Sequence, residues 1–187
     1  MNVQQIFNKV ALLIHHDLTN SQLVDELNEI LKMRFRQLPL PDKFYRFTTT
    51  DTPYYDLPAD CAEDRIRVVT VDDVEYRKVA PETQTVDGPF CMVLAGKLYV
   101  HPNEAGKDAV IYYRPGPITI VNTSQTPNFP EDYHNLLVYD LARYVAEIQR
   151  DVDLVNNFQA RADEIERQAR IGIRKMGVRR VKETMVW

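Results

Sequence analysis

The sequence predicts an α+β fold, in which a helical bundle built from both chain ends carries an inserted antiparallel β-meander and ends in an extended C-terminal arm. Two observations predict it. Apolar residues recur every three or four positions in residues 2–37 and again in 128–176, which is typical of amphipathic helices. Between them, residues 43–120 alternate with period two, and most of the eleven prolines punctuate this stretch.

The N-terminal block is predicted to hold two helices. The apolar stripe of the first helix ends at His16-Asp17. The spacing of Thr19 and Gln22 is that of a capping box, so a second helix can begin there. Pro39 and Pro41 end this second helix. The apolar positions of the first are Val3, Ile6, Phe7, Val10, Leu13 and Ile14, and those of the second are Leu23, Leu27, Ile30, Leu31 and Phe35.

The middle block is predicted to form about five short strands. Asp72-Asp73 separates two alternating runs, and a hairpin turn is predicted there. Ala95-Gly96 separates another pair, and glycine there can adopt a positive φ. The expected extended segments are 43–50, 66–71, 74–79, 90–94, 97–101 and 109–113, of which the first is rich in aromatic residues and threonine.

The third block is predicted to be helical from an N-cap at Asn128, with Pro130 in the first turn and Glu131 at the third position. Its apolar seam leaves two alternatives: one helix over 130–176, or a break near Asp151 that folds the chain back as an antiparallel pair. We favour the break, because Asp153 can cap a second helix. The predicted division of a single domain, residues 1–187, is 1–42 (N-terminal helices), 43–127 (β insertion), 128–176 (C-terminal helices) and 177–187 (arm).

Composition limits the function classes. The chain has 44% hydrophobic and 27% charged residues, as an ordinary globular domain does, and no apolar run long enough for a membrane span. Residues 1–10 lack the basic and apolar pattern of a signal peptide, so none is expected. A net charge of -4 gives no general attraction to nucleic acid or anionic membrane. Cys61 and Cys91 are expected to be buried free thiols, although a disulfide between them is an alternative.

No catalytic, cofactor or metal residues are predicted. Cys61, Cys91, His101 and His134 are scattered without zinc spacing, and the glycines form no phosphate-binding loop. The adjacent carboxylates at 72–73 and 131–132 do not face each other as in a glycosidase. The ten tyrosines could form a stacking platform, but strand propensity explains them more simply, and alternation puts the members of each Tyr-Tyr pair on opposite faces.

Several segments occur in an order that resembles one protein family. A leucine-proline opening of the sheet, a Tyr-Tyr strand and a proline-acidic-tyrosine start of the C-terminal helix follow one another, and the N-terminal helices precede them. The segments are 54–60 (YYDLPAD), 97–102 (KLYVHP), 110–115 (VIYYRP), 129–134 (FPEDYH) and 136–142 (LLVYDLA), with Leu23, Asp25–Leu27 and Asn28 before them. In this order and spacing, over roughly four fifths of the chain, the sequence resembles the head-to-tail adaptor (head-tail connector) proteins of tailed bacteriophages.

The resemblance implies a non-catalytic virion protein, made in the host cytoplasm, that lies in the neck between capsid and tail. It would bind beneath the portal protein as a homo-oligomeric, twelve-fold ring, contact tail or nozzle proteins, and extend the channel for genome ejection. DNA would pass through without specific binding, and no membrane would be involved. The alternative function is that of a β-rich carbohydrate- or receptor-binding tail subunit. An enzyme is the third function considered.

The C-terminal segment is the predicted interface with the portal or a neighbouring subunit. The family's contact comes from this region, and tryptophan and arginine are common interface anchors. The alternative is a solvated tail. The residues concerned are Arg174, Lys175, Val178, Arg179, Arg180, Val181, Lys182, Met185 and Trp187. Arg167, Arg170, Arg174 and Lys175 could instead face DNA, but a solvated helix face or an acidic portal surface is favoured, since a tight grip would stall ejection.

Overall fold

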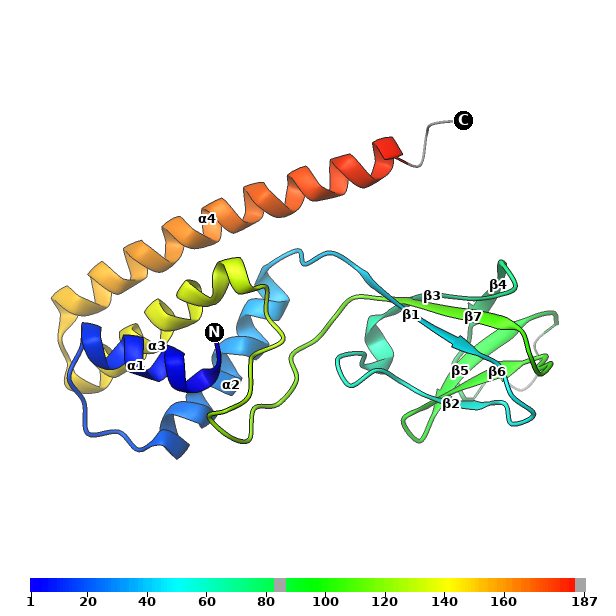
Figure 1. The fold of residues 1–187 in the computed structure, drawn as a ribbon, viewed down its shortest axis with the longest axis horizontal. Helices are drawn as coiled ribbons and strands as arrows, with labels where there is room; N and C mark the ends of the chain where they lie inside the picture. Colours follow the sequence, from blue (N-terminus) through cyan, green and yellow to red (C-terminus); the bar gives the residue numbers. More distant parts are fainter. Residues whose placement is uncertain (83–86, 184–187) are drawn as a thin grey trace. The chain divides into compact units, whose positions relative to one another are not determined.

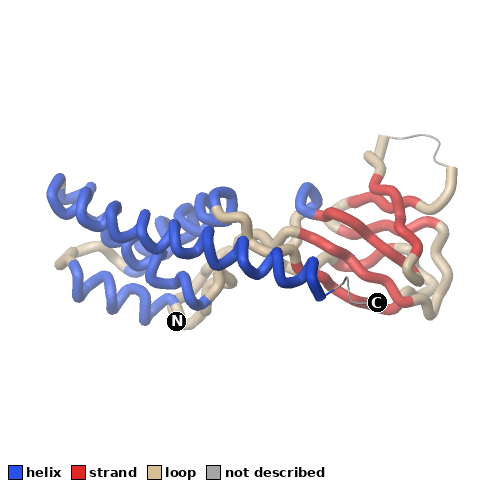
Figure 2. The backbone as a smooth tube through the Cα atoms, turned by 90° about the horizontal axis from the view of Figure 1, so that it is seen from above, coloured by secondary structure: helices blue, strands red, loops and turns tan. Residues whose placement is uncertain are grey.

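The computed structural model describes residues 1–82 and 87–183, with side chains as far as Gly172. The chain divides into two compact units (Figure 1). The helical unit comprises Met1–Leu40 and Pro117–Trp187, and the sheet unit comprises Pro41–Gly116. Figure 2 shows that the long helices belong to the first unit and the strands to the second. The predicted α+β class is therefore confirmed.

The first two helices begin at capping boxes, as their sequences favour. Helix α1 spans Val3–Leu13 and α2 spans Asn20–Gln37. At α2, the Thr19 hydroxyl accepts a hydrogen bond from the Gln22 amide, and the Gln22 side chain accepts one from the Thr19 amide. The prediction of a second helix starting after Thr19 is confirmed, and Leu38 closes it ahead of the two prolines.

The predicted break in the C-terminal helix is also confirmed. Helix α3 spans His134–Gln149 and α4 spans Val152–Glu183. Arg150 adopts a left-handed conformation with φ 58°, which ends α3. The cap of α4 is Asp151, whose carboxylate accepts a hydrogen bond from the Leu154 amide at 3.0 Å. The prediction of Asp153 as the cap is wrong, because Asp153 is the second residue of α4.

The predicted start of the third helical block is also wrong. Residues Glu131–Tyr133 form a 3₁₀ turn, η2, and α3 begins after it. The residue that precedes this turn is Pro130 rather than Asn128, and the Asn128 carbonyl oxygen accepts a hydrogen bond from the Ile118 amide. Asn128 therefore fixes the loop that returns from the sheet unit.

The helical unit has its own apolar core. Helices α1, α2 and α3 supply most of it, and α4 adds a narrow seam of one aromatic and two small residues. Its buried members include Ile6 and Val10 of α1, Leu27, Leu31 and Phe35 of α2, Leu137, Leu141 and Val145 of α3, and Phe158, Ala162 and Ala169 of α4.

The sheet unit contains seven strands, among the residues described, rather than about five. They are β1 (Lys43–Thr48), β2 (Tyr54–Asp56), β3 (Ile66–Val71), β4 (Val74–Lys78), β5 (Phe90–Leu94), β6 (Lys97–His101) and β7 (Asp108–Tyr113). The spatial order is β1-β7-β3-β4-β5-β6-β2. Both predicted hairpins are confirmed: Asp72 and Asp73 turn with φ 47° and 64°, and Ala95 and Gly96 with φ 49° and 77°.

The predicted antiparallel meander is wrong. Strand β7 lies between β1 and β3, and β4 pairs with β5 in parallel. The composition of β7 suits a strand with a neighbour on each side, since Ala109, Val110 and Ile111 are buried in succession, on both faces of the sheet. The inner face forms a second core with Val69, Leu98 and Val100. Cys61 and Cys91 are buried and free, as expected.

The extended arm predicted from residue 177 is not confirmed. Helix α4 runs through Gly172 and Gly177 to Glu183, so residues 178–183 are helical in the structure. Four of these six residues are arginine, lysine or glutamate, which are good helix formers. Residues 184–187 lie outside the described part of the chain. No helix in the described part is long and apolar enough to cross a membrane.

Candidate assembly surface of the helical unit

A buried arginine joins three helices. Arg34 of α2 donates two hydrogen bonds to the Asp140 carboxylate of α3, from Nε at 2.7 Å and Nη2 at 2.5 Å. The side chains of Arg34 and Asp140 are 4% and 0% exposed. Such a bidentate pair fixes both distance and orientation, so it sets the position of α2 against α3.

The same guanidinium also holds α4. Arg34 Nη1 lies 2.6 Å from Glu166 Oε2, and Arg170, one turn further along α4, pairs with the same carboxylate at 2.6 Å. Burial acts to lower the pKa of Arg34, but its hydrogen bonds and charge contacts with Asp140 and Glu166 raise it overall. The pKa of Glu166 is lowered despite its partial burial, because Arg170 and Arg34 stabilise the carboxylate.

Helix α4 runs back along α3 and then continues past it. By Gly172 it has reached the turn that precedes α3, since a methyl group added there would lie 2.8 Å from the Tyr133 hydroxyl. Residues 173–183, the α4 overhang, extend the helix by about 16 Å at about 1.5 Å per residue. In Figure 1 the helix continues beyond the N-terminal end of α3.

Most of the predicted interface residues belong to this overhang. The backbone at Arg174, Lys175, Val178, Arg179, Arg180, Val181 and Lys182 is helical, whereas Met185 and Trp187 lie outside the described residues. Five basic residues and one acidic residue, Glu183, fall within 173–183. Their role as an interface stays a prediction.

Two of the basic residues considered for DNA contact are engaged within α4. Arg167 pairs with Glu164 at 2.8 Å, and Arg170 pairs with Glu166. Each arginine therefore has a carboxylate on the same helix, three or four residues before it, and the net charge of this stretch is small. Strong attraction to phosphates is not expected from such pairs.

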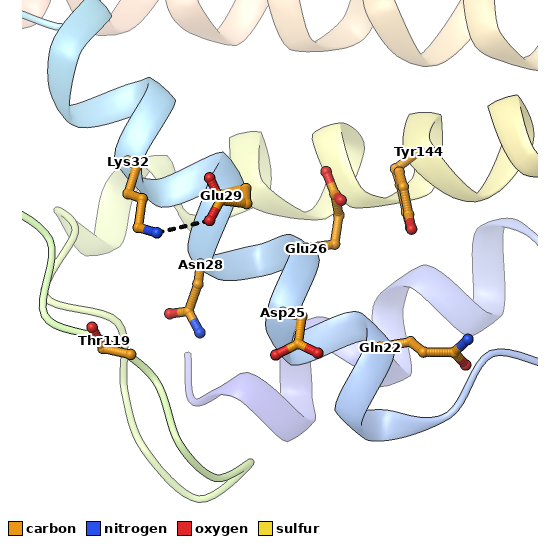
Figure 3. Close-up of a pocket in the computed structure, with 8 residues that line it drawn as sticks. All are labelled: Gln22, Asp25, Glu26, Asn28, Glu29, Lys32, Thr119 and Tyr144. Atoms are coloured by element: carbon orange, nitrogen blue, oxygen red, sulfur yellow. Dashed lines mark hydrogen bonds and ion pairs between the residues drawn. The ribbon is translucent and has the colours of Figure 1, made fainter.

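A groove that sequence reasoning missed lies along α2. It has a volume of about 530 Å³ and is lined mainly by Asp25, Glu26, Glu29 and Lys32 of α2 and Tyr144 of α3 (Figure 3). We call it the acidic groove. The run Asp25–Glu29 (DELNE) carries the acidic signal in the sequence, but the contribution of Tyr144, more than a hundred residues away, depends on the tertiary fold.

Asn28 fixes one wall of the acidic groove. Its side chain donates a hydrogen bond to the Ile120 carbonyl at 2.9 Å and accepts one from the Ile120 amide at 2.8 Å. These two bonds hold the segment of Thr119 and Ile120 against α2, as a strand would hold its neighbour. The groove is thus built from well-anchored parts of the helical unit.

Negative charge dominates the acidic groove. Among the described residues that line it, Lys32 is the one basic side chain, and it already pairs with Glu29 at 2.7 Å. The pKa of Glu26 is raised by burial and by the charges of Glu147 and Glu29, while Arg143 opposes this. A cation placed here would relieve repulsion between carboxylates.

The groups considered for chemistry have structural surroundings. Burial raises the pKa of the Cys61 and Cys91 thiols to about 11, so they are poor nucleophiles at neutral pH. His134 is buried, with Nε2 2.8 Å from the Phe129 carbonyl oxygen. Within the described residues, no group of three or more His, Cys, Asp or Glu side chains is arranged to hold a metal ion.

The tyrosine pairs alternate as predicted, but one exposed face gathers aromatic rings. Tyr55 is buried and Tyr54 exposed. Tyr54 lies 5.2 Å from Tyr99, Tyr99 lies 6.2 Å from Phe90, and Phe90 lies 5.1 Å from His101, all between ring centroids. The four rings form a row across β2, β6 and β5, tilted by 40–53° rather than coplanar.

Comparison with known proteins gives the family. The family model described as SU10 adaptor protein matches residues 1–183, which includes both units and the whole of α4. No curated protein matches the chain. A match over nearly the full length confirms the resemblance seen in the motifs. The chain belongs to the SU10 adaptor protein family, and is thus one of the head-to-tail adaptors of tailed bacteriophages.

Proposed function

We propose that this chain is a structural, non-catalytic subunit of a virion neck, where copies form a ring that joins the portal to the tail and extends the DNA channel. Family membership supports a head-tail adaptor role. The ring, the channel and genome ejection go beyond what family membership supports and are part of the proposal. The observation that carries this step is α4, which is anchored in its own unit by Arg34 and then projects an overhang beyond α3.

The proposed interface with the portal or a neighbour is the C-terminal segment, residues 174–187. A helix that continues past the body it packs on offers the continuation to another subunit. We propose that DNA passes without specific binding, in keeping with a net charge of -4 and the pairing of Arg167 and Arg170 with glutamates.

Removal of residues 178–187 tests this proposal. The truncation ends α4 after the residues that pack on α3, so the circular dichroism per residue and the unfolding midpoint should stay close to those of the full chain. Ring formation on purified portal, seen by negative-stain electron microscopy, should be lost. A truncated chain that folds and still forms rings would contradict the role given to the C-terminal segment.

The aromatic row favours a second candidate function, a carbohydrate- or receptor-binding tail subunit. Exposed rings on a sheet can stack on the apolar faces of sugars. The tilt between neighbouring rings and the family match favour the adaptor role instead. A glycan array decides between them: specific binding that is lost in Tyr54→Ala and kept in Tyr112→Ala, an exposed tyrosine on another strand, would support the second candidate.

A further inference from the structure

We propose that the acidic groove of one copy receives the basic α4 overhang of a neighbouring copy, so that copies join head to tail. This deepens the proposed ring and rests on it, and it names the two surfaces that would meet.

Charge complementarity is the first support. The overhang sequence contains Arg174, Lys175, Arg179, Arg180 and Lys182 against one acidic residue. The acidic groove carries three carboxylates and, among its described lining residues, a single lysine that is already paired. The overhang and the groove therefore carry an excess of charge of opposite sign. The carboxylates that raise the pKa of Glu26 would be stabilised by an arriving cation.

The direction of α4 is the second support, because it rules out the copy's own overhang as the occupant. Helix α4 reaches Tyr133, at the beginning of α3, by Gly172. The groove residue of α3 is Tyr144, which lies about 16 Å further along α3 in the opposite direction. A continuous α4 therefore carries its basic residues away from its own groove. An overhang that fills this groove therefore comes from another copy.

The size and chemistry of the groove suit long basic side chains. A volume of about 530 Å³ admits a few side chains rather than a whole helix. Figure 3 shows Tyr144 projecting from α3 beside Glu26 of α2. Asp25 and Glu29 lie along α2 on either side of Glu26 in the sequence. A guanidinium between Glu26 and Tyr144 would gain an ion pair and an aromatic face together.

The symmetry that follows agrees with a ring. The groove and the overhang are different surfaces, so the contact between two copies leaves one groove and one overhang free. Such heterologous contacts generate closed rings when the rotation between copies closes. A reciprocal two-fold dimer, in which each copy fills the groove of the other, would leave neither surface free, and the number of copies counted below distinguishes it from a ring.

Charge reversal tests the contact. In the groove variant, Asp25→Lys is combined with Glu29→Lys, both exposed positions. In the overhang variant, Arg179→Glu is combined with Arg180→Glu. Native mass spectrometry then counts copies on portal, and sedimentation measures self-association without portal. We expect each variant alone to associate with its own kind at least tenfold more weakly than the wild type.

Rescue by mixing is the decisive result. The lysines of the groove variant face the glutamates of the overhang variant, and the two unaltered surfaces also match, so an equal mixture should rebuild rings with alternating copies. Asp163→Lys with Glu75→Lys, exposed acids outside the groove, gives the same change in charge and should leave association unchanged.

Failure of the groove contact and failure of the proposed function give different results. If the groove variant fills portal rings like the wild type, or the mixture shows no rescue, the groove contact is wrong while the adaptor role stands. If the wild type never binds portal, the proposed function fails, and the groove contact is then judged by sedimentation alone. Equal self-association by the wild type and the groove variant, or no self-association by either, would overturn the groove contact.

Discussion

Arg34 shows how a single side chain can decide the position of a helix. It is buried, yet it carries a charge, and its two carboxylate partners come from α3 and α4. Burial of a charge is tolerated only with such compensation. The seam of α4 is otherwise narrow, with Phe158, Ala162 and Ala169 as its buried apolar members among the described side chains.

Replacing Arg34 with methionine should destabilise the helical unit by about 3–5 kcal/mol, because the buried Asp140 carboxylate would lose its ion-pair partner and Glu166 would keep only Arg170. Urea unfolding followed by the helical circular dichroism signal measures this. Arg167→Met is the matched control, since Arg167 pairs with Glu164 at the surface of the same unit, and should cost less than about 1 kcal/mol. Equal effects of the two substitutions would show that the buried network does not hold the helices.

His134 gives the helical unit a dependence on pH. Burial lowers its pKa from the ordinary value of 6.5, although the hydrogen bond with the Phe129 carbonyl opposes this. The unfolded chain therefore binds a proton at a pH where the folded chain does not. Stability due to this group is complete above pH about 6.5 and is lost as the pH falls below it.

The predicted outcome is a fall in the free energy of unfolding between pH 7 and pH 5 that becomes shallower in His134→Gln. Urea titrations at several pH values compare the slopes, with His15→Gln, an exposed histidine, as the control that keeps the wild-type slope. A steeper fall in His134→Gln than in the wild type would contradict the direction of the shift.

At the scale of elements, local signals in the sequence predict what local interactions determine. The capping box at Thr19 and Gln22 and the turns at Asp72-Asp73 and Ala95-Gly96 are complete within a few residues, and all three predictions are confirmed. Strand order is different. The placement of β7 between β1 and β3 and the parallel pairing of β4 with β5 depend on contacts between distant segments. Three-residue β2 is too short to produce a periodic pattern.

The candidate site also has one part that the sequence predicts and one part that depends on the tertiary fold. Charge identifies the basic C-terminal segment from sequence alone, but the sequence pattern predicts an extended arm where the structure has a helix. The acidic groove needs Tyr144 and Thr119 beside α2, and only the fold brings them there. Asn128 has the spacing of an N-cap, but the turn that follows starts after Pro130, and the Asn128 side chain accepts a hydrogen bond from the Ile118 amide of the returning loop.

Gly172 provides a test of where α4 meets the body of the unit. A methyl group at this position would approach the Tyr133 hydroxyl to 2.8 Å, which offsets the gain of up to about 1 kcal/mol that alanine usually brings to a helix. Gly172→Ala should therefore stabilise the chain more in a Tyr133→Phe background than in the wild type. Thermal unfolding of the four proteins measures the difference, and identical effects in both backgrounds would place α4 elsewhere.

At the scale of the whole molecule, charge is distributed unevenly. The protein has a net charge of -4, yet its last helical turns are basic. Association that joins such an end to an acidic groove should weaken with salt, since the screening length falls from about 10 Å at 0.1 M to about 3 Å at 1 M ionic strength. Occupancy of portal by the wild type, measured across this range, should fall, and occupancy that rises with salt would indicate an apolar contact instead.

The central claim is that copies of this chain form a ring between portal and tail. Electron cryomicroscopy of portal mixed with the full chain tests it most directly. We predict a closed ring of copies on the tail-facing end of the portal, around an open channel, with each α4 directed to the subunit beside it. Isolated copies scattered on the portal, or a portal that carries none of this chain, would contradict the claim.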